Sequence, residues 1–160
     1  MSGITLLVED PKWRTHRGLA ARLASAAEAA RKAARLKGGF TILLAGDKKL
    51  RALNRNFRGK DKPTNVLSFP QAEGKAIARS PMLGDIILAH ETIQREADEA
   101  GKTFADHVSH LVVHGLLHLF GYDHLNDTEA EAMEALEMRA LATLGIDNPY
   151  ADAPLLREAS

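Results

Sequence analysis

Short runs of consecutive apolar residues alternate along the chain with longer stretches in which apolar residues recur every three or four positions. A run of four to eight apolar residues bounded by turn-forming residues is typical of a buried strand, and the three-to-four spacing is typical of an amphipathic helix. The runs predict strands over 4–8, 40–45, 65–69 and 83–89. The spaced pattern predicts helices over 18–36, 47–58, 91–100, 103–120 and 127–144.

Local signals at the helix ends support these boundaries. Asp47 and Thr103 are suitable N-terminal caps for the second and fourth helices, because their side-chain oxygens can accept from free backbone amides. Asp127 or Thr128 opens the last helix, and Thr128 with Glu131 has the spacing of a capping box. Glycine follows the predicted helices at several ends, among them Gly121.

The order of elements predicts an α/β or α+β fold. A strand, a helix, a strand, a helix, two strands and three helices give a small mixed four-stranded sheet packed with about five helices. A chain of 160 residues has the length of one ordinary domain. We expect a single catalytic domain over 1–146 and a loosely held tail over 147–160. The pattern does not indicate which face of the sheet each helix covers.

Histidines are concentrated in the fourth predicted helix and just after it. His107, His110, His114 and His118 project from one stripe of that helix, because a helix advances about 100° per residue. His114 and His118 are one turn apart, so both rings can reach a single metal ion. Gly121 permits a sharp turn that returns His124 toward them.

Three histidine ligands predict one zinc ion per chain with a fourth position left open, the arrangement of catalytic zinc sites. His110 and His114 form an alternative pair at the same spacing, without a third ligand brought back by a glycine. His107 and His110 either line the approach to the metal or form a partly exposed polar face. His16 and His90 are assigned no role.

Composition narrows the chemistry that is available. The chain has no cysteine, which excludes disulfides and thiolate ligands and permits a reducing cytoplasm. No apolar run approaches the roughly 20 residues of a membrane span, and the N-terminus lacks the features of a secretory signal. The formal net charge is zero, so an overall electrostatic attraction for nucleic acid is not indicated.

The charge is nevertheless unevenly distributed. Seven basic residues and one acid lie between Lys48 and Lys62. Arg58 ends this strip's helix, and Lys60 and Lys62 follow in a loop closed by Pro63. An arginine fork can grip two phosphate oxygens, so this loop beside a zinc site predicts a phosphodiester substrate. We expect Arg58, Lys60, Lys62 and Arg55 to contact the phosphates of that substrate.

The string from His114 to His124 resembles the zinc motif of metzincin proteases in its histidine spacing. Those proteases place a glutamate general base directly after the first histidine, where this chain has Gly115. Glycine can neither accept a proton nor orient a water molecule. A metallopeptidase is therefore a remote alternative.

The same string, the loop 58–70 and the segment 83–86 closely resemble the bacterial YbeY family. The resemblance implies a metal-dependent endoribonuclease specific for single-stranded RNA, acting in maturation of the 16S rRNA 3′ end and in ribosome quality control. It implies zinc ligation by His114, His118 and His124, and catalytic roles for Arg58 and His114. With RNA as the implied substrate, we expect Lys60, Lys62 and Arg55 to bind it. It also implies rRNA, the small ribosomal subunit and ribosome-associated proteins as partners, no membrane association and a cytoplasmic location.

The sequence leaves alternatives open for the function and for the roles of Asp85 and Asp123. The alternative function is a ribosome-assembly binding factor whose zinc is mainly structural. Asp123 is either a carboxylate that orients a zinc ligand or a capping or solvent-exposed residue. Asp85, in a predicted strand, either orients a histidine or a loop or satisfies backbone donors.

Overall fold

The computed structural model describes residues 3–123 and 125–146, and the predicted tail over 147–160 lies outside them. The strands are β1 (Ile4–Val8), β2 (Gly39–Ala45), β3 (Val66–Pro70) and β4 (Met82–Ala89). The α-helices are α1 (Leu19–Ala33), α2 (Asp47–Arg58), α3 (His90–Ala100), α4 (Phe104–Leu119) and α5 (Asp127–Thr143). Two short 3-10 helices, η1 (Pro11–Thr15) and η2 (Gly74–Ala76), were not predicted.

The four strands form one mixed sheet in the order β1-β2-β4-β3. β1, β2 and β4 are parallel, and β3 pairs with β4 in the antiparallel direction at one edge. Parallel neighbours need a long connection, which α1 supplies between β1 and β2. The carboxyl ends of the three parallel strands therefore meet along one edge of the sheet. The expected class, a small mixed sheet with five α-helices, is confirmed.

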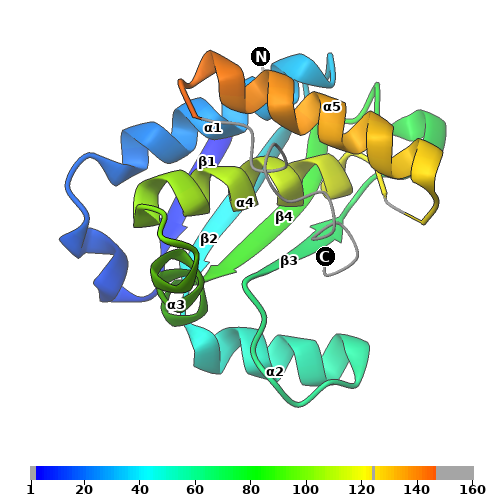
Figure 1. The fold of residues 1–160 in the computed structure, drawn as a ribbon. Helices are drawn as coiled ribbons and strands as arrows, with labels where there is room; N and C mark the ends of the chain where they lie inside the picture. Colours follow the sequence, from blue (N-terminus) through cyan, green and yellow to red (C-terminus); the bar gives the residue numbers. More distant parts are fainter. Residues whose placement is uncertain (1–2, 124, 147–160) are drawn as a thin grey trace.

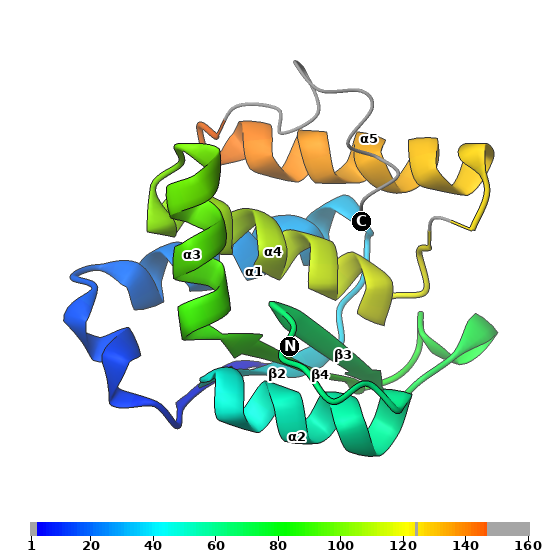
Figure 2. The same ribbon diagram turned by 60° about the horizontal axis from the view of Figure 1, so that its bottom comes forward.

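Helices cover the two faces of the sheet very unequally. α1 and α4 pack on one face, and α5 lies across them as an outer layer, whereas α2 lies alone under the other face (Figures 1 and 2). The large core lies between the sheet and the α1–α4 layer, where Leu23, Ile42, Ile86 and Leu116 are fully buried. Three alanines of α1 are also fully buried, and their small side chains permit its close approach to α4.

A smaller apolar cluster lies between the sheet and α2. It contains Leu50 of α2, with Leu67 and Ile87 from the sheet and Ala45 and Ala89 at two strand ends. Alternation along β4 places Ile86 on the α4 side and Ile87 on the α2 side. This alternation determines whether a sheet residue can contact α4 or α2.

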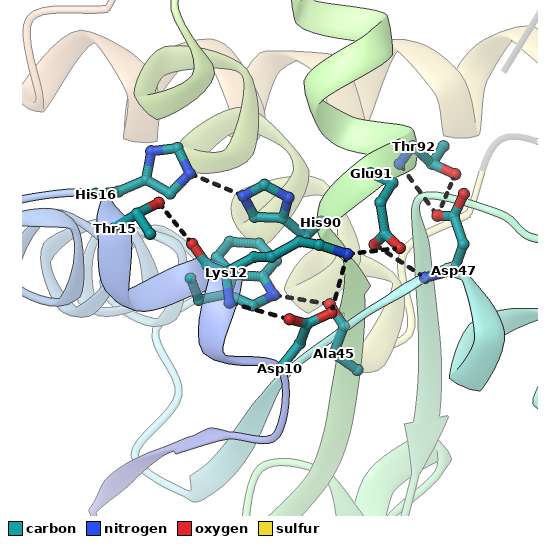
Figure 3. A network of polar contacts seen from close by, with 10 residues as sticks. Asp10, Lys12, Thr15, His16, Ala45, Asp47, His90, Glu91 and Thr92 are labelled. Carbon is teal, nitrogen blue, oxygen red and sulfur yellow. Dashed lines mark hydrogen bonds and ion pairs between the residues drawn. The ribbon is translucent and has the colours of Figure 1, made fainter.

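Two of the predicted helix caps differ from the structure. α2 begins after Gly46, and the Asp47 carboxylate instead accepts from the backbone and hydroxyl of Thr92 in α3 (Figure 3). Glu91 of α3 in turn accepts from the backbone amide of Asp47, so the two helix starts satisfy each other's free amides. α5 is capped by Asn126, whose side chain accepts from the Glu129 amide, rather than by Asp127 or Thr128.

The end of α4 follows the prediction closely. The Tyr122 amide donates to the Leu117 carbonyl and the Gly121 amide to the His118 carbonyl, each at 3.0 Å. Gly121 has φ of 99°, which a residue with a side chain rarely adopts. This pattern is a Schellman motif, and it turns the chain immediately after His118. At the start of α4, Thr103 caps the helix as predicted by accepting from the Asp106 amide.

Candidate metal centre and the residues around it

The stripe of histidines along α4 faces acidic side chains from its neighbouring helices. His107 Nε2 lies 2.9 Å from Glu96 Oε1 of α3, and His110 Nε2 lies 3.1 Å from Glu137 Oε2 of α5. His107 and His110 therefore each face a carboxylate of a neighbouring helix. Asn65 joins the first contact, because its amide also donates to Glu96.

Glu137 is the centre of the second contact and is completely buried. Its other oxygen, Oε1, lies 2.5 Å from His114 Nδ1. Burial alone would raise the pKa of Glu137, but hydrogen bonds to His110 and His114 and the charges of those rings lower it to about 2. Burial also lowers the pKa of His110. Glu137 is thus an ionised acceptor held between two imidazole rings.

The ionised carboxylate determines which nitrogen of His114 carries a proton. A carboxylate only accepts hydrogen bonds, so His114 Nδ1 must be the N–H that donates to it. The neutral ring then has an unprotonated Nε2 with its lone pair directed away from Glu137. A carboxylate behind a histidine in this way is the usual partner of a metal-ligating imidazole.

His114 Nε2 faces the corresponding atom of His118. The two Nε2 atoms lie 3.2 Å apart, with the ring planes at 82° to each other. Two nitrogens bound to one tetrahedral zinc ion at the usual bond length are separated by roughly 3.3 Å. The spacing and the donor chemistry of this pair therefore fit zinc. His124, the third predicted ligand, lies outside the described residues.

A second grouping of potential ligands lies deeper along α4. One ligand atom each from His110, His114 and Glu137 lies within 4.8 Å of the others, so these three residues could hold a metal ion. Hydrogen bonds already join Glu137 to both histidines of this grouping. The two arrangements share His114.

Close packing on the sheet fixes the middle of α4. The Ser68 hydroxyl donates to the Gly115 carbonyl at 2.8 Å. A Cβ atom at position 115 would lie 3.0 Å from Val66 Cγ2 and 3.7 Å from Ile86 Cγ2. Position 115 thus faces β3 and β4, and the absence of a side chain there allows the histidine helix to lie directly on the edge strand.

The predicted RNA-binding residues gather at the end of α2 and in the loop after it. Arg58 is the last residue of α2, and Arg58, Lys60 and Lys62 are all exposed. Within the described part of the chain these three form no ion pair. Arg55 shares Asp61 with Arg51, at 3.8 and 2.9 Å respectively. The Arg51 hydrogen bond is the main cause that lowers the pKa of Asp61.

The structure does not bring Asp85 to the histidines. Asp85 lies opposite Phe69 in the β3–β4 register, and strand alternation puts it on the same side as Ile87, facing the α2 layer. Asp123 is half-buried just beyond the turn that ends α4.

His16 and His90 form a second histidine pair at the carboxyl ends of the parallel strands (Figure 3). Their Nε2 atoms lie 2.8 Å apart. His16 stacks on Phe104 with ring centroids 4.1 Å apart, and Trp13 lies edge-on to His90. The sequence showed no signal for this pair, because the two residues are separated by 74 positions.

Comparison with known proteins identifies the family to which this architecture belongs. A family model described as "Endoribonuclease YbeY" matches residues 9–145. The chain belongs to the YbeY family. The predicted resemblance is confirmed over nearly all of the described residues.

Individual members of the YbeY family are also similar in sequence. A relative from Sphingopyxis alaskensis, named endoribonuclease YbeY, is 58% identical over 118 residues, covering 69% of this chain and 70% of the relative. One of the same name from Methylocella silvestris is 60% identical over 111 residues, covering 69% and 62%. One from Rhodopseudomonas palustris strain HaA2 is 49% identical over 151 residues, covering 88% and 77%.

The fold is found in a solved structure as well. The solution structure of a protein from Thermotoga maritima is 26% identical, with a TM-score of 0.56, and the match covers 95% of this chain and 97% of that one. In the described part of the chain, no helix is both long and apolar enough to span a membrane.

Sequence reasoning missed Glu137, which holds His110 and His114 in place. A signal was present, because Glu137 falls within the buried stripe of α5 formed by Met133, Ala140 and Leu141. A carboxylate is rarely fully buried unless it has a partner. A glutamate at a core position of one helix, in a chain with a histidine row on another, is therefore a recognisable partner for that row.

Proposed function

We propose that this YbeY-family chain is a zinc-dependent endoribonuclease specific for single-stranded RNA. The observation that carries the proposal is the orientation of His114, whose Nδ1–H is held by buried Glu137 and whose Nε2 faces that of His118. The names of the relatives support the same activity. The strip of exposed cations at the end of α2 supports a polyanionic substrate.

The zinc ion would be held by His114 and His118, with His124 as the third ligand. This choice is favoured over the group of His110, His114 and Glu137 because Glu137 is fully buried and both its oxygens already accept hydrogen bonds. A site there would leave no position for water or substrate. His114 and His118 are only partly buried, and their Nε2 atoms face each other at 3.2 Å.

Zinc bound there would supply Lewis-acid chemistry and lower the pKa of a bound water toward about 7. The chain's own residues do the rest. Glu137 keeps the His114 proton on Nδ1, so Nε2 stays available as a ligand. Arg58 binds the scissile phosphate through its planar fork and stabilises the charge that develops there. Analysis of the product ends decides whether water or the ribose 2′-OH attacks.

Lys60, Lys62 and Arg55 would hold the flanking RNA through its phosphates. With a net charge of zero, affinity rests on a few local contacts. Each phosphate neutralised on a single strand contributes about −0.7 to the slope of log K against log salt, so we expect a slope of roughly −2 to −3. Replacing Lys60 and Lys62 together by alanine flattens that slope and weakens binding, with zinc content unchanged.

Cleavage by zinc-loaded protein, purified free of other ribonucleases, tests the proposed activity. Wild type should cut a single-stranded oligoribonucleotide and leave its duplex intact. Arg58→Ala should retain zinc and lose turnover by roughly 10²- to 10³-fold, as for loss of one transition-state donor, and Arg58→Lys tests the need for the fork. Equal cleavage by wild type and Arg58→Ala contradicts the proposal. Binding without cleavage favours the assembly factor with structural zinc.

The proposed cellular role is maturation of the 16S rRNA 3′ end and ribosome quality control in the cytoplasm, with the small ribosomal subunit as partner. Cells lacking the protein should accumulate 16S rRNA with unprocessed 3′ ends, measurable by sequencing of those ends. Restoration by wild type but not by Arg58→Ala is the expected result. Peptide hydrolysis is not proposed, since position 115 packs against the sheet and offers no general base.

A further inference from the structure

One aromatic ring on the α2 side of the molecule is unusually exposed. Phe57 is 68% exposed, and it is the only Phe, Tyr or Trp in the described residues that is mainly open to solvent. Most of the other rings are buried in the large core. Burying a Phe side chain fully would raise the ratio of folded to unfolded protein roughly 10- to 100-fold. The exposed position of Phe57 therefore does not contribute this stabilisation.

The ring of Phe57 is nevertheless held in place. It meets Phe69 of β3 edge-to-face, with centroids 5.4 Å apart and the planes at 70°. Edge-to-face contact uses the edge of one ring and leaves aromatic face exposed. Phe57 and Phe69 therefore form a small fixed aromatic step between the last turn of α2 and the edge strand of the sheet.

The surroundings of this step are strongly basic. Arg58 follows Phe57 directly, and the loop after it folds back along α2, since Asn54 donates to the Lys62 carbonyl and Arg51 holds Asp61. Lys60 and Lys62 thus lie beside the last turns of the helix. The only acid in this segment, Asp61, is neutralised by arginine. An open aromatic face among unpaired cations is the combination that binds single-stranded nucleic acid.

We propose that an unpaired base of the RNA stacks on Phe57 beside the phosphate that Arg58 holds. The inference rests on the proposed nuclease function and adds a source for its preference for single strands. A base within a duplex is already stacked on both sides and has no free face for a protein ring. Charge alone would not make this distinction, because both forms of RNA carry phosphates.

The position of the Phe57–Phe69 step also indicates where bound RNA crosses the sheet. Ser68 contacts α4 on one side of β3, whereas Phe69 lies with the α2 cluster on the other side. β3 is an edge strand of the sheet formed by the described residues. RNA held at both Phe57 and the α4 histidines therefore passes around the free edge of β3.

Binding of a labelled single-stranded oligoribonucleotide to Phe57→Leu tests the proposal without requiring cleavage. Stacking of one base is worth about 5- to 150-fold in affinity, and we expect a loss in that range. The salt slope should stay that of wild type, because leucine removes a ring and no charge. Lys60→Ala should show the opposite signature, a slope reduced by about 0.7. Leu7→Ala, which alters an exposed residue on the far edge strand, should bind as wild type.

A second variant keeps the test decisive if Phe57→Leu fails to fold. Phe57→Trp adds an exposed indole, while the native Trp13 is buried and bonded to the Ala45 carbonyl. Its emission should be quenched by single-stranded RNA and remain unchanged with duplex or with an abasic strand. Equal affinity of Phe57→Leu and wild type, or equal quenching by the abasic strand, overturns the proposal.

Failure of the stacking proposal is distinguishable from failure of the nuclease proposal. If wild type cleaves RNA and Phe57→Leu binds normally, only the stacking role is wrong. If wild type cleaves nothing yet Phe57→Leu loses affinity, stacking stands and the nuclease activity is wrong. If wild type binds no RNA, the step serves another partner, such as an acidic protein, and both proposals are overturned.

Discussion

Two pairs of histidines in this molecule present the same atoms to each other and differ in what stands behind them. His114 and His118 approach through their Nε2 atoms at 3.2 Å, and His16 and His90 do so at 2.8 Å. The first pair is backed by Glu137, which fixes the proton of His114 on Nδ1. No carboxylate among the described residues contacts the buried ring of the second pair in this way.

The absence of a carboxylate changes the proton arrangement at His90. Its Nδ1 is buried and has no hydrogen-bond partner among the described residues. A buried N–H without an acceptor is rarer and costlier than a buried lone pair without a donor. His90 Nδ1 is therefore unprotonated, and His90 donates its Nε2–H to His16 Nε2. The proton occupies the place where a metal ion would bind.

The distance between two histidine nitrogens therefore does not by itself identify a metal-binding pair. The buried acid on the far nitrogen keeps the near nitrogen free of its proton. The hydrogen bond between His16 and His90 ties the segment after η1 to the start of α3 (Figure 3).

The largest expected effect is on zinc content, and only a change in the His114–His118 pair should cause it. His118→Ala should remove most of the one zinc ion per chain, because two remaining histidines bind it poorly. His16→Ala should keep full zinc, since that pair has no carboxylate to prepare it. Metal analysis after dialysis measures both. Near-stoichiometric zinc in His118→Ala together with its loss from His110→Ala would favour the group of His110, His114 and Glu137.

The second effect tests the carboxylate itself. Glu137→Gln keeps the shape of the side chain but can donate a proton where Glu137 only accepts, so His114 is no longer held in the ligating form. Zinc affinity should fall about 10- to 100-fold, the usual cost of losing such a partner. Competition with a chromogenic chelator measures the affinity. Glu131→Gln, an exposed position of the same helix, serves as the matched control and should bind zinc as wild type.

The smallest effect concerns the pH dependence of stability at the second pair. Burial, followed by the charge of His16, lowers the pKa of His90, and Lys12 adds to this while Glu91 and Asp10 oppose it. The unfolded chain therefore binds more protons at this site, and folding stability falls as the pH drops below about 6.5 toward the folded pKa.

Replacement of His90 by an apolar ring should remove that part of the pH dependence. We expect the free energy of unfolding of wild type to fall more than that of His90→Phe between pH 7 and pH 5.5. Urea unfolding followed by Trp13 fluorescence gives both values, because this single tryptophan lies edge-on to the His90 ring. Parallel pH profiles for the two proteins would show that the pair does not titrate as described.

Much of the fold was predictable because it depends on local periodicity. The strand Ile4–Val8 matches its predicted range, and every α-helix was predicted to within a few residues. The predicted caps at Asp47 and at Asp127 or Thr128 were wrong, because several nearby side chains can accept from the first amides of a helix and tertiary neighbours decide which one does. The strand order and the covering of the faces were not predictable, because alternation does not say which strands become neighbours.

The candidate site was predictable only along one helix. The spacing of His114 and His118 is local and fixes their common direction. Glu137 lies on another helix, so its approach to His114 depends on how α5 crosses α4. The pairing of His16 with His90 and of Phe57 with Phe69 depends on tertiary structure in the same way.

We expect the zinc ion to bind between the Nε2 atoms of His114 and His118, with Glu137 behind His114. Anomalous diffraction at the zinc absorption edge from crystals of the zinc-loaded protein tests it most directly. The account predicts one peak per chain at about 2.0–2.1 Å from both Nε2 atoms, with Glu137 still bonded to His114 Nδ1. A peak among His110, His114 Nδ1 and Glu137, or one between His16 and His90, would contradict it.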